Sequence, residues 1–188
     1  TIYGARHELP YPFIVFATQN PIEFEGTYPL PEAQQDRFLL KIVLNYPLPE
    51  HEVAVLQRYH AGFRSQNLDR AGITPVLNAD QLRSLREEVN AVNVEEKIFN
   101  YIYEIVSATR ASNDILVGAS PRAGLALVSA SKALAALRSR NFVIPDDVKE
   151  LAVPVMRHRV LLRPETEIEG LTVDQVLHLL VEAQVVPR

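Results

Sequence analysis

The chain has 188 residues, of which 47% are hydrophobic, and a formal net charge of −4 at pH 7. This composition can fill the core of one ordinary domain or two small ones, and it excludes a global basic field for nucleic acid. The absence of Cys excludes disulfides and thiolate metal sites, and the five His residues lack the short spacings of a zinc site.

Targeting signals are also missing from the pattern. No apolar run approaches about 20 residues, so we expect no membrane span. The first ten residues lack the charged start and apolar stretch of a signal peptide, and we expect a cytoplasmic protein. The chain opens without Met in the middle of a pattern, and we expect further residues upstream.

The first fifty residues alternate between strand and helix patterns. Residues 1–10 are compatible with a hairpin, and the continuous apolar run at 13–17 predicts a strand buried on both faces of a parallel sheet. Asn20 follows that strand, at the kind of edge where parallel sheets bind ligands. A short helix over 31–38 and a strand over 39–44 complete an α/β segment.

The proline-rich stretch Tyr46-Pro47-Leu48-Pro49 cannot continue a strand and predicts a domain boundary between residues 48 and 49. Helical spacing and capping signals dominate after it. We expect helices over 50–61, from 78 past 89, over 98–109, 120–137 and 146–159, and over 172–181. The predicted fold class is α/β followed by all-α, with domains 1–48 and 49–188.

Arg122 is the most informative position in the chain. Ser120 as the N-cap and Pro121 at the first helical position place Arg122 in the first turn of a helix, where a cation is locally unfavourable. A bound phosphate would reverse the sign of this effect, because helix donors and the guanidinium would converge on one anion. An exposed arginine lying along an apolar helix explains the position equally well.

Two further positions have both a catalytic and an ordinary interpretation. Asn20 can donate and accept hydrogen bonds, as orienting an attacking water requires, but Asn before Pro is also a common turn pair. Arg37 can be a finger that reaches a nucleotide on a neighbouring subunit. It can equally be a cation at a helix end or a partner for Asp36. Taken singly, both residues favour the ordinary interpretation.

The order of these residues and the sequence around them favour the catalytic interpretation instead. Residues 16–38 contain FATQNPIE, EGTYPLPEAQ and DRF, and residues 118–122 read GASPR. In these stretches the chain closely resembles the MoxR family of AAA+ ATPases. By that resemblance Asn20 matches sensor 1, Arg37 matches the arginine finger and Arg122 matches sensor 2. These three are the candidate catalytic residues, and Asn20 and Arg122 are also the candidates for nucleotide binding.

The resemblance covers essentially the whole chain. Phe24 and Gln35 depart from the usual Gln and Leu, but they lie beside the functional positions. The resemblance implies that residues 1–48 are the C-terminal part of a parallel-sheet P-loop AAA+ core and that residues 49–188 are a helical lid carrying sensor 2. It further implies a homo-oligomeric ring, expected to be a hexamer, that hydrolyses ATP to remodel or mature client proteins.

The expected cofactors are ATP and Mg²⁺, yet the motifs that hold them are absent. The chain has no G-x-x-x-x-G-K-[ST] phosphate loop and no apolar strand ending in Asp-Glu. We therefore expect no ATP hydrolysis by this polypeptide alone. Within a ring, the resemblance implies that Asn20 and Arg122 serve the nucleotide of their own subunit and that Arg37 serves the neighbour's.

Other functions compete with this one. A non-catalytic helical protein-interaction module, or a degenerate ATPase that kept its sensors, fits the same sequence. A nucleic-acid motor fits less well, because basic and aromatic residues are not interleaved. The cluster of Arg157, His158 and Arg159 with Arg163 can touch nucleic acid or a partner, but the pattern favours a solvated, ion-paired lid surface.

Overall fold

Residues 4, 6–19, 30–66 and 72–187 of the computed structural model are described here, and they are mostly helical. The chain divides into one unit of residues 1–13 with 43–84 and another of residues 14–42 with 85–188. The predicted domains, 1–48 and 49–188, stay a prediction. In the described part of the chain, no helix is long and apolar enough to cross a membrane.

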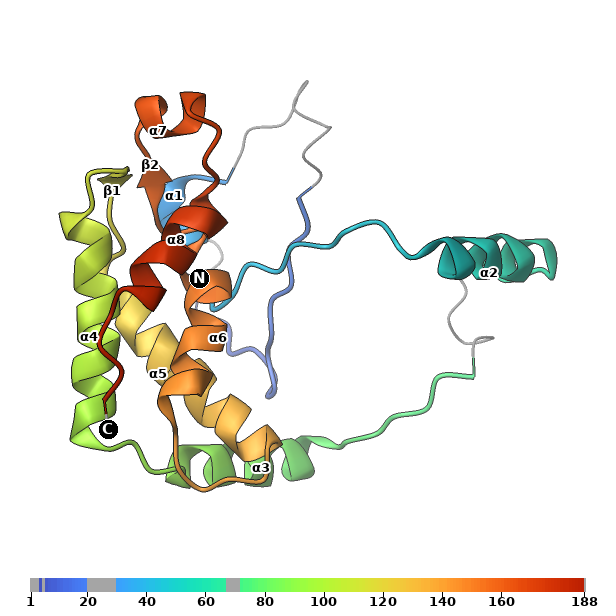
Figure 1. Cartoon of the computed structure of the whole chain (residues 1–188). Coiled ribbons are helices and arrows are strands. Elements are labelled where there is room, and N and C mark those ends of the chain that lie inside the picture. Colours follow the sequence, from blue (N-terminus) through green and yellow to red (C-terminus); the bar gives the residue numbers. More distant parts are fainter. Residues whose placement is uncertain (1–3, 5, 20–29, 67–71, 188) are drawn as a thin grey trace. The chain divides into compact units, whose positions relative to one another are not determined.

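Four helices of the second unit pack around one apolar core (Figure 1). They are α4 (Glu96–Ala111), α5 (Pro121–Leu137), α6 (Pro145–Met156) and α8 (Val173–Glu182). The spacing of three and four residues on α4 predicts one buried face, and this prediction is confirmed by Ile98, Ile102, Ile105 and Thr109. The other helices contribute buried Leu127, Val148, Ala152, Val155, Val176 and Leu177.

A small sheet and a short helix extend this core. Strand β1 (Ile115–Val117) pairs antiparallel with β2 (Leu161–Leu162), with Ile115 opposite Leu162. Helix α7 (Pro164–Ile168) follows β2 directly. Because Ile115 and Leu162 are both buried, the sheet fastens the chain before α5 to the chain after α6.

The capping signals in the sequence are confirmed. The side chain of Ser120 accepts a hydrogen bond from the Arg122 amide at the start of α5, with Pro121 at the first helical position. Thr172 and Gln175 form the predicted capping box at the start of α8. The same reciprocal hydrogen bonds join Asn78 and Gln81. These three helices therefore begin where their local chemistry predicts.

The first unit contains α2 (Pro49–His60) and the beginning of α3 (Ala79–Ala91). Both helices were predicted, and Gly62 after α2 adopts a positive φ of 96°, a conformation that glycine tolerates. Neither helix has a fully buried residue. The three- and four-residue spacing of Leu82, Leu85 and Val89 predicts one buried face on α3, but this prediction is wrong for Leu85, which is exposed, while Leu82 and Val89 are partly buried.

The strands predicted at 13–17 and 39–44 are wrong for this structure. Neither segment forms a strand in the described part of the chain, and Phe13, Ile14, Val15 and Phe16 are exposed. A strand needs neighbouring strands to pair its backbone groups, so an apolar pattern cannot form one alone. The helix expected at 31–38 is shorter, with α1 (Glu32–Gln35) followed by turns. The possible hairpin falls partly on residues 1–3 and 5, outside the described residues.

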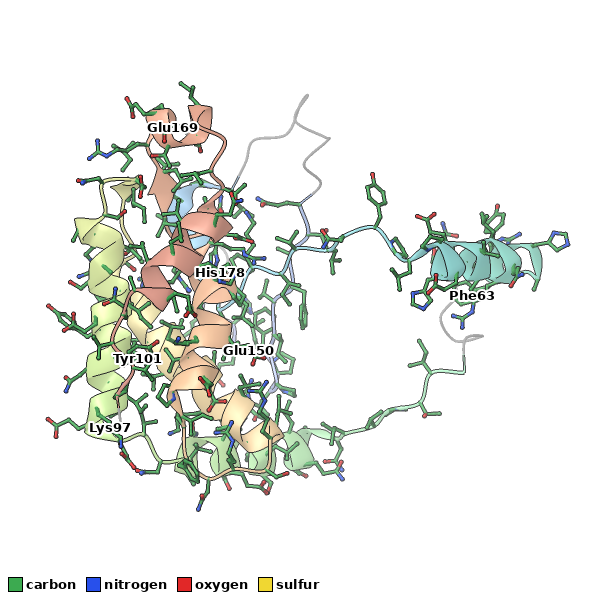
Figure 2. The ribbon with its side chains drawn as sticks, viewed as in Figure 1. Phe63, Lys97, Tyr101, Glu150, Glu169 and His178 are labelled. Carbon is green, nitrogen blue, oxygen red and sulfur yellow. The ribbon has the colours of Figure 1, made fainter. Side chains whose placement is uncertain are left out.

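A buried carboxylate joins the end of α5 to the start of α6. Asp147 is fully buried, and its carboxylate accepts hydrogen bonds from Arg140, from Arg138 and from the Ile144 amide. Arg138 also pairs with Glu150 at 2.6 Å, and Glu150 is labelled on α6 in Figure 2. Burial alone would raise the pKa of Asp147, but these hydrogen bonds and positive charges outweigh burial and lower it.

Candidate functional site

The loop before α5 is fastened to the end of α4. The Ala119 amide donates to Thr109 Oγ1 at 3.0 Å, and Thr109 Oγ1 donates to the Val106 carbonyl at 2.7 Å. Arg110 Nε donates to the Ala119 carbonyl at 2.8 Å. Because Ala119 is held on both its amide and its carbonyl, the first turn of α5 and the Arg122 backbone have a fixed position.

Gly118 makes this close approach possible. A Cβ at Gly118 would lie 2.7 Å from the Arg110 Cα, whereas a Cβ at Gly124 would meet only Ile102 Cγ2, at 3.8 Å. We expect Gly118→Ala to destabilise the 188-residue chain by about 1–3 kcal/mol, through overpacking against backbone. Gly124→Ala should be neutral or stabilising by up to about 1 kcal/mol, since Ala is the better helix former. Urea denaturation of both variants checks this, and equal midpoints would contradict it.

Asp36 is the centre of the candidate site. Its carboxylate accepts hydrogen bonds from Ser120 Oγ, at 3.2 Å to each oxygen, and pairs with Arg122 Nη1 at 3.3 Å. Arg159 Nε donates to Asp36 Oδ1 at 3.1 Å. One carboxylate thus joins the segment after α1, the start of α5 and the segment after α6. It also offsets the unfavourable position of Arg122 at the positive end of α5.

The two arginines on Asp36 differ in environment. The side chain of Arg122 is 55% exposed, whereas that of Arg159 is only 3% exposed. Burial lowers the pKa of Arg159, and the hydrogen bond and charge of Asp36 partly offset this. Arg122 can therefore exchange its partner for a ligand, while Arg159 cannot leave Asp36 without an uncompensated buried charge.

The basic cluster at 157–159 is ion-paired, as the sequence predicts, but Arg157 and Arg159 are not solvated, and that part of the interpretation is wrong. Arg157 is ion-paired with Asp174 at 2.9 Å, but its side chain is only 16% exposed. It also donates to the Lys41 carbonyl, at 3.4 Å. His158 Nε2 lies 3.1 Å from the Phe38 carbonyl. The cluster therefore binds the segment that follows α1.

The protonation state of His158 follows from its partners. A carbonyl only accepts, so Nε2 carries the hydrogen, and Nδ1 is buried without a hydrogen-bond partner in the described part of the chain. Burial is the largest cause that lowers the pKa of His158. The Phe38 carbonyl and Asp36 oppose this shift, whereas the charges of Arg159 and Lys41 add to it.

This lowered pKa predicts a pH dependence of stability. The unfolded chain binds a proton on His158 at a higher pH than the folded chain does, so the free energy of unfolding falls as the pH drops below about 6.5. We expect His158→Gln to flatten this fall between about pH 7 and pH 5. His178, exposed on α8 and labelled in Figure 2, is the matched control. Thermal unfolding of His158→Gln and His178→Gln across this pH range checks the prediction. It is contradicted if the stability of His158→Gln falls with pH as steeply as that of the unmodified chain.

A pocket of about 330 Å³ lies beside the Asp36 network. Leu125 and Ala126 of α5 give it an apolar wall. Its polar lining comes from Asp36, Arg37, Arg122 and Arg159. Three guanidiniums and one carboxylate leave a net positive lining, which suits an anion such as phosphate.

Among the described residues, Arg37 is an unpaired member of this lining. Its side chain is exposed and forms no ion pair or hydrogen bond among the described residues. Asp36, the sequence neighbour that could have paired with it, is bound by Ser120, Arg122 and Arg159 instead. An unpaired guanidinium at the edge of a positive pocket is available to an anionic ligand.

The structure thus brings two of the three predicted residues together. Arg37 and Arg122 line one pocket, whereas Asn20 lies outside the described residues. Sequence reasoning missed Asp36 and Arg159 as parts of the site. The sequence gives no local signal for their pairing, because they lie 123 positions apart. No group of three or more His, Cys, Asp or Glu side chains in the described ranges is arranged to hold a metal ion.

Two protein families match separate segments of this chain. Residues 1–40 match the family described as "ATPase family associated with various cellular activities (AAA)". Residues 107–179 match the "AAA lid domain" family. The lid match includes β1, α5, α6, β2 and α7, and therefore Arg122 and Arg159.

Relatives are longer than this chain. An uncharacterised Bacillus subtilis protein, YeaC, is 40% identical over 187 residues, which cover 100% of this chain and 57% of YeaC. "Chaperone MoxR1" of Mycobacterium tuberculosis is 37% identical over 100% of this chain and 50% of its own length. "Protein MoxR" of Paracoccus denitrificans is 32% identical over 86% of this chain and 52% of its own length. The chain spans about half the length of these relatives.

A solved structure is similar to this chain over its whole length. A protein of Cytophaga hutchinsonii, described as a candidate ATPase, superposes with a TM-score of 0.87 at 36% identity. The match covers 100% of this chain and 58% of that one.

Proposed function

We propose that this chain, which is a MoxR-like AAA+ ATPase segment, supplies the lid and two phosphate-recognising arginines to an enzyme that hydrolyses ATP. The observation that carries the proposal is the shared pocket of Arg37 and Arg122. A guanidinium matches the geometry of phosphate oxygens, and two of them can stabilise the charge that builds up in phosphoryl transfer.

The residues of the pocket fit a nucleotide phosphate but not its metal ion. Arg37 and Arg122 would hold phosphate oxygens, while the described residues offer no carboxylate cluster for Mg²⁺. When bound, ATP with Mg²⁺ would supply the phosphoryl group that is transferred to water. Within this chain, the arginines would bind and orient the phosphate, and Asn20 would orient the attacking water.

The geometry supports a different assignment of Arg122 from the one that the family resemblance implies. Arg122 was expected to serve its own subunit's nucleotide and Arg37 the neighbour's. Because both side chains line one pocket, we propose that they act together on the same nucleotide, held by the neighbouring subunit. Arg122 would exchange Asp36 for phosphate on binding, and Arg37 would bind without breaking an ion pair seen in the described residues.

We also propose a fold, an assembly, a location and a role for the complete protein. Residues 1–48 would complete the edge of a parallel-sheet P-loop core whose phosphate loop and magnesium ligands lie in the rest of the complete protein. The active form would be a homo-oligomeric ring, with six subunits expected, in the cytoplasm. The name of one relative, "Chaperone MoxR1", supports a chaperone-like role, and we propose that this role is to remodel or mature client proteins.

Turnover of ATP by the complete protein tests this function. We expect Mg²⁺-dependent hydrolysis by the assembled protein and none by the 188-residue chain alone. A complete protein that assembles but neither binds nor hydrolyses ATP would reject the proposal and leave the non-catalytic module.

A further inference from the structure

Arg159 contacts the chain on both sides of Arg37. Its Nη2 donates to the carbonyl of Asp36, at 3.2 Å, and to the carbonyl of Phe38. Its Nε donates to the carboxylate of Asp36 at 3.1 Å. One guanidinium therefore fixes the residues immediately before and after Arg37.

The position of Arg159 is itself set by the lid. Its Nη1 donates to the carbonyl of Val155 in α6, and its amide donates to the carbonyl of Met156 at 2.8 Å. The next residue, Val160, is buried, and β2 follows it. The positions of α6 and β2 therefore determine where Arg159 lies, and Arg159 in turn fixes the position of the turn that contains Arg37.

The same residue also reaches Arg122 through one shared carboxylate. Asp36 pairs with Arg159 on one side and with Arg122 on the other. The exposed fractions of 3% and 55% make Arg159 the fixed member and Arg122 the exchangeable one. Asp36 therefore keeps its place when Arg122 turns to a ligand, because Arg159 still neutralises it.

We propose that Arg159 is a positioning residue, which holds Arg37 and, through Asp36, Arg122 in the geometry that phosphate recognition needs. The inference rests on the proposed function for its catalytic consequence, but not for its structural part. Arg159→Lys separates fork geometry from charge, because an ammonium keeps the charge without the planar set of donors. Arg163→Lys is the matched control, since Arg163 lies four residues away and is exposed.

Hydrogen exchange of the 188-residue chain tests the structural part. We expect exchange in residues 35–41 to accelerate on the order of tenfold in Arg159→Lys and to stay unchanged in Arg163→Lys. Acceleration spread evenly over α4, α5, α6 and α8 would show a general stabilising role and overturn the proposal. Unchanged exchange in residues 35–41 would overturn it as well.

Steady-state kinetics of the complete protein test the catalytic part. We expect Arg159→Lys to lower kcat by a factor on the order of 10², with the KM for ATP close to the unmodified value, because small misplacements are costly in catalysis. If Arg37→Ala lowers turnover and Arg159→Lys does not, this inference fails alone. If Arg37→Ala leaves turnover normal, the proposed role of Arg37 fails, whatever the exchange experiment shows.

Discussion

Replacing Arg37 by Ala should lower ATP turnover of the complete protein by a factor on the order of 10³ or more, while nucleotide affinity changes little. The reason is the state of this side chain in the structure. Arg37 lines the positive pocket and has no ion pair in the described part of the chain, so a phosphate can gain its full charge-assisted interaction. Its removal takes away stabilisation of the developing charge and leaves Arg122 and Arg159 in place.

Arg163→Ala is the control for loss of one exposed guanidinium from the same unit. Its turnover should match that of the unmodified protein. Nucleotide affinity is measured by equilibrium binding, and assembly by sedimentation, so that a defect in either is separated from a defect in kcat. Turnover of Arg37→Ala at the unmodified rate would remove the assignment of this residue as a finger.

The second large effect concerns stability. Asp147→Ala should lower the free energy of unfolding of the lid by roughly 2–4 kcal/mol, from the loss of a helix-start acceptor and of charge-assisted hydrogen bonds. The Ile144 amide loses its acceptor, and Arg138 and Arg140 lose the carboxylate between them. Because both arginines are partly in water, we expect less than a fully buried ion pair would cost.

Asp146→Ala provides the matched control, since Asp146 is the exposed neighbour in the same helical turn. It should cost only a few tenths of a kcal/mol, from the helix dipole. Asp147→Asn keeps an acceptor for the Ile144 amide but loses the charge, so its stability should fall between the two. Chemical denaturation measures all three, and an equal loss in Asp146→Ala and Asp147→Ala would contradict this account.

The helical part of the fold was predictable because its signals are local. Ser120 with Pro121, Thr172 with Gln175, and the buried spacing of Ile98, Ile102 and Ile105 each depend on residues a few positions apart. Such signals act on the backbone where they stand, and the structure follows them.

The strands were not predictable in the same way. The apolar runs at 13–17 and 39–44 describe what a strand would bury, but strand formation depends on partners elsewhere in the chain. Within this chain those segments find no strand partner among the described residues, and they form no strand and stay largely exposed.

The site was half predictable. Arg122 stood out because a cation at a helix start is locally unfavourable, and the structure answers this with Asp36, which lies 86 positions away. Arg159 carried no comparable signal, since a basic tripeptide resembles a solvated surface. Only burial and long-range contacts distinguish its role, and neither can be read from spacing.

We propose that Arg37 and Arg122 of one subunit act on the same nucleotide. Mixing Arg37→Ala subunits with Arg122→Ala subunits tests it most directly, since every interface then receives an incomplete pair and turnover should stay at the level of the separate variants. Recovery of turnover on mixing would contradict the claim, because it requires the two arginines to serve different nucleotides.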